Sequence, residues 1–204
     1  MHIERCFAVG ALMAIGLAST SVVARATDQA VAASSPIEFK CPDRTTAVHL
    51  DNGATITWQG RDGRACRREL TVGTGEKYRQ VWFAPTFTGA ANASWAFFDQ
   101  TKPWGLWPLR VGEKMPGRYD GVGSDPGFPG SWVYTTVVEK HETLRTRAGV
   151  FDVFVVSRKE EALGASFKST TREWYAPELG VSVKTAYSDN SGNDNAQEAV
   201  SIDR

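Results

Sequence analysis

The side chains of this sequence best suited to holding a ligand are five aromatic residues. Aromatic rings stack on sugar rings and pack against acyl chains, and two of the five lie in a Gly- and Pro-rich stretch of the kind that often carries function. Core packing is the competing interpretation for each, because aromatic side chains also dominate the interiors of small β domains. We therefore treat them as candidate ligand-binding residues for a lipid or a glycan. They are Trp104, Trp107, Trp132, Trp174 and Tyr175.

Four arginines near Cys66 are a second candidate group. Guanidinium groups bind phosphates and carboxylates through paired hydrogen bonds, so this set could hold an envelope lipid or glycan. Asp62 and Glu69 interrupt the set, and mixed charge of this kind favours a solvated turn. The four residues are Arg61, Arg64, Arg67 and Arg68.

Metal-ligating residues are too sparse for a metal site. His141 and Glu139 offer two ligands on one strand face, whereas a closed zinc site needs about four. Asp120 and Asp125 lack the regular alternation of oxygen ligands that a calcium loop requires, and we interpret them as turn residues. We predict no metal and no cofactor.

Catalytic motifs are equally sparse. The sequence has no Gly-x-Ser-x-Gly elbow, and no strand-turn-helix setting for one. A hydrolase with carboxylates from separate strands stays open, because a sheet can bring distant residues together without a local motif. We favour a non-catalytic protein.

The N-terminus has the pattern of an export signal. Residues 6–23 form an uncharged run of small and apolar residues, and a small-x-small cleavage motif follows at 24–26. The mature chain is expected to start at Thr27, to be periplasmic or secreted, and to have no stable membrane insertion once the signal is cleaved. In an oxidising compartment its two cysteines, Cys41 and Cys66, are expected to form a disulfide.

Charge balance argues against nucleic acid as a partner. Removing residues 1–26 would take Arg5 and Arg25 from the 23 basic residues and Glu4 from the 23 acidic residues, leaving 21 and 22 and a net charge of about −1. Nucleic-acid binding depends on an excess of Lys and Arg that neutralises phosphates. We expect a monomer without a nucleic-acid partner.

The elements that must position these residues are β-strands. Alternating and aromatic segments with no helical period predict an all-β fold with an antiparallel meander, arranged as a partly open barrel or as two packed sheets, with a disulfide-stapled hairpin region near the N-terminus. Strands are expected at 78–84 and 94–98, whereas the Gly- and Pro-rich stretch is not expected to hold a regular ladder for long. The predicted organisation is a signal peptide at 1–26, a flexible leader at 27–36, an N-terminal β region at 37–100, a Gly/Pro-rich connection at 101–130 and a C-terminal meander at 131–204.

The first hairpin can be predicted in detail. A two-residue Asn-Gly turn would split its apolar residues between both faces of the ribbon, whereas a three-residue Asp-Asn-Gly loop with a left-handed Gly53 puts them on one face. We prefer the three-residue loop, because it alone gives a single buried side. The apolar residues are Val48, Leu50, Ile56 and Trp58.

Three segments of the C-terminal half carry a family resemblance. They are the strand end VVEKHE, the strand AGVFDVFVV after a small-Gly bend, and the closing segment WYAPELGVSVK. The order resembles the DUF3108-like family of exported bacterial proteins of unknown function, over residues 131–187. The resemblance implies an exported all-β domain of the cell envelope and supplies no catalytic residues. The proline common at the start of the family's bend is replaced here by Arg147.

The orientation of the Trp174-Tyr175 pair depends on the loop that follows it. Pro177 ends the strand and Gly180 can adopt the positive φ that lets the chain return, which predicts a hairpin. A four-residue loop would turn Trp174 toward Val181 and make it a core anchor. A loop with an odd number of residues would give that place to Tyr175 and turn Trp174 outward.

Three functions remain open at this point. The first is a non-catalytic envelope protein that binds a lipid or another amphipathic ligand. The second is a carbohydrate-binding module with planar tryptophans along one sheet face, and the third is the hydrolase with carboxylates from separate strands.

Overall fold

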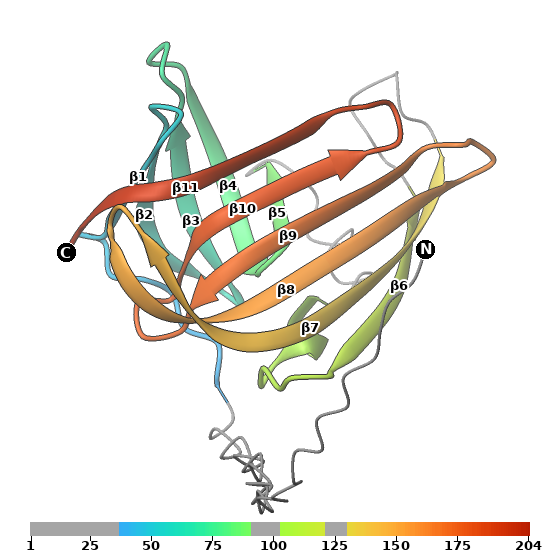
Figure 1. Cartoon of the computed structure of the whole chain (residues 1–204), viewed down its shortest axis with the longest axis horizontal. Coiled ribbons are helices and arrows are strands. Elements are labelled where there is room, and N and C mark those ends of the chain that lie inside the picture. Colours follow the sequence, from blue (N-terminus) through green and yellow to red (C-terminus); the bar gives the residue numbers. More distant parts are fainter. Residues whose placement is uncertain (1–36, 91–102, 121–129) are drawn as a thin grey trace, which may run out of the picture. The chain divides into compact units, whose positions relative to one another are not determined.

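The computed structural model describes residues 37–90, 103–120 and 130–204, which fold into β-strands and one short 3-10 helix (Figure 1). Among these residues, no helix is long and apolar enough to span a bilayer. The N-terminal strands are β1 (Ala47–Leu50), β2 (Thr55–Asp62), β3 (Ala65–Thr71), β4 (Lys77–Ala84) and β5 (Phe87–Ala90), and the helix η1 (Pro103–Leu106) comes next in the chain. The C-terminal strands are β6 (Lys114–Asp120), β7 (Ser131–Thr146), β8 (Gly149–Leu163), β9 (Lys168–Ala176), β10 (Val181–Asp189) and β11 (Asp194–Asp203).

The eleven strands of these described ranges form one antiparallel sheet in the order β5-β4-β3-β2-β1-β11-β10-β9-β8-β7-β6. Each side of this order is a meander of consecutive strands, and the pairing of β1 with β11 joins the two. Within the described part of the chain, the edge strands β5 and β6 pair only with β4 and β7, so the sheet does not close into a barrel. The predicted all-β antiparallel fold is confirmed, as one open sheet and not as two packed sheets.

The sheet curls, so that strands far apart in its order face each other across an inner face. The ring of Trp82 in β4 stacks on Tyr175 in β9 with centroids 5.8 Å apart. Phe87 in β5 meets Tyr134 in β7 edge-on at 5.5 Å. Figure 1 shows the N-terminal strands crossing behind the long strands β7 to β10. The inner face therefore carries the core.

The first hairpin has the predicted three-residue loop. The Leu50 N–H donates to the Ala54 carbonyl at 2.8 Å, and Gly53 has a φ of 81°. Val48 pairs directly with Ile56, so the apolar residues of β1 and β2 share the inner face. The prediction is confirmed in both its loop length and its buried side.

The predicted disulfide is also confirmed. Cys41 and Cys66 are joined with an S–S distance of 2.08 Å. The bond fastens the segment before β1 to β3, where Cys66 is fully buried. Phe39 in that segment packs its ring against Trp82 at 5.6 Å, which extends the aromatic core.

The Gly/Pro-rich stretch needs a correction, because it contains the seven-residue edge strand β6. β6 pairs with β7 along its whole length, from Lys114 to Asp120. An edge strand tolerates Pro116, because proline's missing N–H can face away from the ladder. Gly117 is required by close approach, since a Cβ there would lie 2.2 Å from the Tyr134 ring. The strand predicted at 94–98 lies outside the described residues.

Candidate functional site

The five candidate aromatics do not form one surface. Trp107 and Tyr175 meet edge-on in the core with ring centroids 5.6 Å apart. Trp104 packs against Phe83 at 5.9 Å. Trp132 is buried and stacks on Tyr119 at 6.1 Å. These contacts are packing contacts of the inner face.

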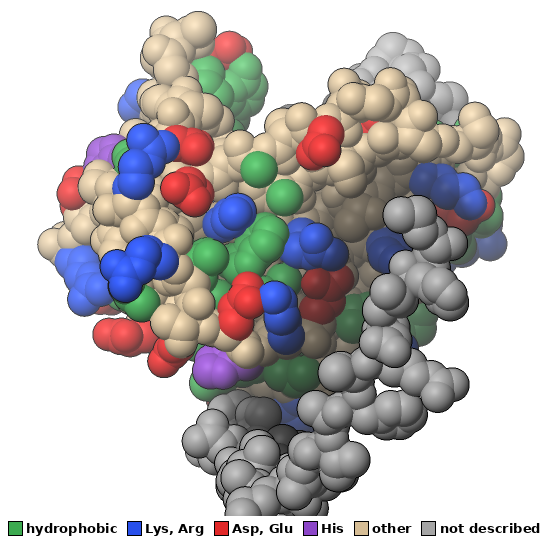
Figure 2. Space-filling model, in the orientation of Figure 1, with side chains coloured by type: hydrophobic (Ala, Val, Ile, Leu, Met, Phe, Trp, Pro, Cys, Tyr) green, Lys and Arg blue, Asp and Glu red, His purple; other side chains and the backbone are tan. Residues whose placement is uncertain are grey.

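Trp174 lies on the opposite, outer face of the sheet. Its Nε1 donates to Glu142 Oε1 at 3.0 Å, and the Lys184 ammonium lies 5.0 Å from its ring centroid. Figure 2 shows Lys, Arg, Asp and Glu side chains interspersed around a small hydrophobic area over the strands on this side. Arg172 and Glu139 form a two-point ion pair there, at 3.0 and 3.1 Å. The outer face is therefore a mixed-charge surface with one half-buried tryptophan.

The orientation of Trp174 and Tyr175 depends on a β-bulge in β10, which the length of the preceding loop does not predict. Ala176 pairs with Val181, so the loop has the four residues 177–180 that were expected to send Trp174 inward. The register then shifts between Ser182 and Lys184, and Trp174 pairs with Lys184. Tyr175 consequently takes the core position. The conditional prediction for a four-residue loop was wrong, because a bulge inserts the extra residue within the strand.

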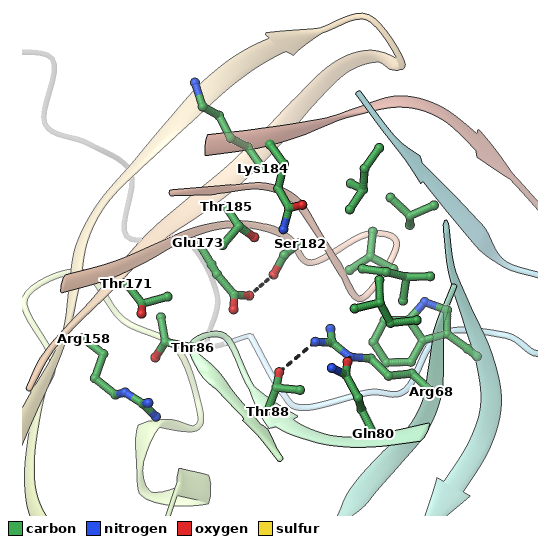
Figure 3. A pocket seen from close by; sticks show the side chains of 17 residues that line it. Arg68, Gln80, Thr86, Thr88, Arg158, Thr171, Glu173, Ser182, Lys184 and Thr185 are labelled. Carbon is green, nitrogen blue, oxygen red and sulfur yellow. Dashed lines mark hydrogen bonds between the residues drawn. The ribbon is translucent and has the colours of Figure 1, made fainter. Parts of the chain in front are cut away.

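A pocket of about 360 Å³ lies on the inner face between the two meanders (Figure 3). Its apolar wall consists of Val48, Leu50, Ile56, Trp58, Leu70 and Val181. Its polar lining consists of Arg68, Gln80, Thr86, Thr88, Arg158, Thr171, Glu173, Ser182, Lys184, Thr185 and Gln197. The lining includes none of the five aromatics that the sequence singled out, although it includes Arg68 from the arginine group.

Strand register explains the apolar wall. Val48, Ile56 and Leu70 form one cross-strand row through β1, β2 and β3. Side chains in one row point to the same face of a sheet. The three-residue loop of the first hairpin therefore sets this wall, since a two-residue turn would have divided its members between the faces.

Arg68 belongs to the neighbouring row, between Trp58 and Gln80. Its Nε donates to Gln80 Oε1 and its Nη2 to Thr88 Oγ1, both at 2.9 Å. Its guanidinium carbon lies 5.8 Å from the Trp58 ring centroid. Burial lowers the pKa of Arg68 to about 10, and the charge of Glu173 opposes this change.

Glu173 is the charged group on the facing wall. It occupies a row with Val156 and Thr185 and is only 7% exposed. Its Oε2 accepts a hydrogen bond from the Ser182 hydroxyl. Attraction to Arg68 and this hydrogen bond compensate in part for the cost of burying a carboxylate.

Arg158 reaches the pocket from β8, in a row with Thr136 and Thr171. Its Nη2 lies 3.0 Å from Glu160 Oε1, and its guanidinium carbon lies 4.9 Å from the Phe87 ring centroid. The same Glu160 oxygen accepts from the Tyr119 hydroxyl at 2.9 Å. Burial raises the pKa of that tyrosine, and the Glu160 charge raises it further.

Thr86 contributes an unusual backbone conformation. Pro85 and Thr86 form the two-residue turn between β4 and β5, and Thr86 has a φ of 69°. Gly or Asn is usual at the second position of such a turn, and a β-branched residue with positive φ is an outlier. Thr86 is 4% exposed, and its hydroxyl has no hydrogen-bond partner among the described residues.

The other arginines of the group point elsewhere. Arg67 alternates with Arg68 on β3 and pairs with Asp62 at 2.7 Å on the outside of the sheet. Arg61 lies over the Phe39 ring and Arg64 over the Trp104 ring. The sequence group therefore contributes one residue to the pocket, because side chains alternate along a strand.

Metal-ligating side chains do not converge in the described part of the chain, where no group of three His, Cys, Asp or Glu residues could hold an ion. His141 packs its ring against Phe154 at 4.8 Å. Asp120 is the last residue of β6, and Asp125 lies outside the described residues.

Glu173 is also the one carboxylate among the described residues that line the pocket. Hydrolysis of a glycosidic bond by the usual route uses two carboxylates on either side of the bond. The lining offers hydrogen-bond donors, amide and hydroxyl acceptors, one carboxylate and an apolar wall.

The chain is similar to two solved structures at low sequence identity. No family model and no curated protein matches the chain. One similar solved structure, from Bacteroides fragilis, is described as a "putative exported protein with YmcC-like fold". It has a TM-score of 0.41 and 12% identity, over 83% of this chain and 100% of that one. Another, from Parabacteroides distasonis, is described as a "putative lipoprotein", with a TM-score of 0.36 and 12% identity over 82% and 99% of the two chains. The resemblance to the DUF3108-like family stays a prediction.

Proposed function

We propose that this protein is an exported, non-catalytic protein that binds one amphipathic small molecule in the pocket of Figure 3. The observation that carries the proposal is the division of the lining. The row of Val48, Ile56 and Leu70 provides an apolar wall, and Arg68 and Glu173 provide polar groups within the same cavity. A ligand with an apolar chain and a polar end matches both parts.

The size of the pocket fits a single small ligand. Its volume of about 360 Å³ lies within the range of roughly 300–1,000 Å³ typical of small-molecule sites. Small-molecule sites usually have a mainly apolar lining, whereas eleven of the seventeen residues that line this pocket are polar or charged, which favours a ligand with a polar end. A carbohydrate module is less well supported, because Trp107, Trp132 and Tyr175 are packed inside and do not form a flat exposed strip.

Export is supported by the signal pattern of residues 1–26 and by the Cys41–Cys66 disulfide, since disulfides form and persist mainly in oxidising compartments. The resemblance of residues 131–187 to the DUF3108-like family implies the cell envelope. We propose a periplasmic or secreted location for the mature chain.

The proposal is tested by native mass spectrometry and by calorimetric titration. Protein recovered from the periplasm of an expressing bacterium is expected to have the mass of a chain starting at Thr27 and to carry a bound amphipathic molecule. Stripped of that molecule, it is expected to bind octanoate and other eight-carbon amphiphiles with one site per chain.

The apolar wall gives a variant with a matched control. Ile56→Gln should weaken octanoate binding about fivefold, because the half-buried Ile56 side chain faces the ligand. Thr57→Gln changes the next residue of β2, which faces the other side of the sheet, and should leave binding unchanged. No binding of any eight-carbon amphiphile, or equal losses in the two variants, would contradict the proposed function.

A further inference from the structure

The pocket has more basic than acidic side chains, and this difference bears on the charge of its ligand. Two guanidinium groups line it, those of Arg68 and Arg158, against the single carboxylate of Glu173, whereas the ammonium of Lys184 lies over the Trp174 ring on the outer face. Arg158 has a partner in Glu160, which lies outside the lining. The cation of this lining whose hydrogen bonds go to neutral groups is therefore Arg68.

Arg68 carries the least compensated of these charges. Both of its hydrogen bonds go to neutral acceptors, Gln80 and Thr88. Its pKa is lowered to about 10, because burial removes water from the cation and the attraction of Glu173 only partly opposes this effect. A charge-assisted hydrogen bond to an anion is about twice as strong as one between neutral groups, and the guanidinium fork can offer two.

Buried hydrogen-bond donors that lack acceptors also favour a negatively charged group on the ligand. Trp58 Nε1 and Arg158 Nε are buried and have no hydrogen-bond partner within the described ranges. Both groups can only donate. The Thr86 hydroxyl, which can donate or accept, also has no hydrogen-bond partner within the described ranges. These atoms belong to residues of three different strands and turns around the same cavity.

The two arginines of the pocket lie apart from each other. Figure 3 shows Arg158 and Thr86 near one end of the labelled polar groups, Arg68 with Thr88 and Gln80 near the other, and Glu173 bonded to Ser182 above them. A negative group beside Thr88 would face Arg68. It would leave Glu173 bonded to Ser182.

We propose that the polar end of the ligand is an anion, a carboxylate or a phosphate monoester, held by the Arg68 guanidinium with the Trp58 side chain beside it. This inference rests on the proposed function, since it assigns the charge of the ligand in the same pocket. The apolar wall holds the chain and Arg68 selects the head group.

The first test compares head groups on one eight-carbon chain by calorimetric titration of the purified protein. Octanoate is expected to bind at least about tenfold more tightly than methyl octanoate, and octylamine more weakly than both. Octyl phosphate separates the two anion classes, because tighter binding than octanoate would assign the phosphate and weaker binding the carboxylate. Equal affinities for octanoate and methyl octanoate would overturn the inference and leave the proposed function standing, whereas failure of every compound to bind would contradict both.

The second test changes the arginines. Arg68→Gln should lower octanoate affinity about tenfold and leave methyl octanoate unchanged, and Arg68→Lys should restore part of the difference. Arg67→Gln is the matched control, because Arg67 is the next residue of β3 and pairs with Asp62 outside the sheet. Equal losses for octanoate and methyl octanoate in Arg68→Gln would overturn the inference. The comparison of head groups on the unmodified protein decides the question even if an Arg68 variant does not fold.

Discussion

Thr86 is the residue at which the structure departs furthest from ordinary local preference. The turn after Pro85 requires positive φ at a position where glycine would be free of strain, yet the chain places a β-branched residue there. A backbone in such a region costs on the order of 1–3 kcal/mol. The cost is consistent with the placement of a buried hydroxyl in the pocket, because glycine could supply the turn but not the hydroxyl.

Replacing Thr86 by glycine is therefore expected to raise the stability of the protein and to lower its affinity for the ligand. Relief of strain outweighs the extra entropy that glycine gives the unfolded chain, so Thr86→Gly should raise the free energy of unfolding by about 1 kcal/mol. Urea denaturation followed by circular dichroism measures the change. Thr88→Gly, within β5, should instead lower stability by about 1–3 kcal/mol, because it also removes the hydroxyl that accepts a hydrogen bond from Arg68. A loss of stability in Thr86→Gly would show that the positive φ carries no strain.

At the scale of elements, the bulge in β10 determines which aromatic residue of β9 enters the core. The four-residue loop and the bulge together bring Tyr175 inward, where it contacts Trp82 and Trp107. Trp174 is left on the outer face, bonded to Glu142 and covered by Lys184. One extra residue in a strand reverses the facing of the residues beyond it.

The two neighbouring aromatics should therefore differ sharply in their contribution to stability. Tyr175→Ala removes a fully buried ring and should lower the free energy of unfolding by about 3–5 kcal/mol. Trp174→Ala removes a half-buried ring with one surface hydrogen bond and should cost about 1 kcal/mol. Chemical denaturation of both variants gives the comparison, and a larger cost for Trp174→Ala would contradict the bulged register.

For the molecule as a whole, the pairing of β1 with β11 makes one sheet from two meanders. Four residues of β1 pair with β11, and the inner faces of both meanders share a core. The disulfide fastens residues before β1 to β3 and does not join the meanders to each other. Cooperativity between the meanders should therefore depend on the sheet and its core and not on the disulfide.

Removal of the disulfide tests this. The double variant Cys41→Ser, Cys66→Ser should lose about 3 kcal/mol of unfolding free energy, because the bond closes a loop of 25 residues in the unfolded chain. It should still unfold in a single calorimetric transition. Two separate transitions, in either the variant or the unmodified protein, would show that the meanders are independent folding units.

Local sequence was sufficient to predict features that depend on only a few residues. The first hairpin was predicted down to its loop, because an Asp-Asn-Gly loop with Gly53 left-handed was the solution that buried all four apolar residues on one side. Cys41 and Cys66 were paired correctly, because they were the two cysteines left after the signal pattern.

The pocket could not be predicted in the same way. Its charged residues come from β3, β8, β9 and β10, and each looks like an ordinary polar strand residue until the strand's inner face is known. A signal did exist at Arg158, which continues the inward alternation of Phe154 and Val156, and at Thr86, which follows proline where glycine is usual. The alternation that includes Arg158 could be interpreted only once the position of β8 in the sheet was known.

The sequence by itself therefore determined the all-β class, the first turn and the disulfide, because each depends on residues close together or few in number. Only the tertiary structure showed that Tyr175 and not Trp174 is in the core, because the length of the loop does not indicate whether the following strand contains a bulge. It also decided that Arg68, Arg158, Glu173 and Thr86 surround one cavity. Those contacts depend on how the long sheet curls and which strands face each other, which is a property of the packed chain and of no single segment.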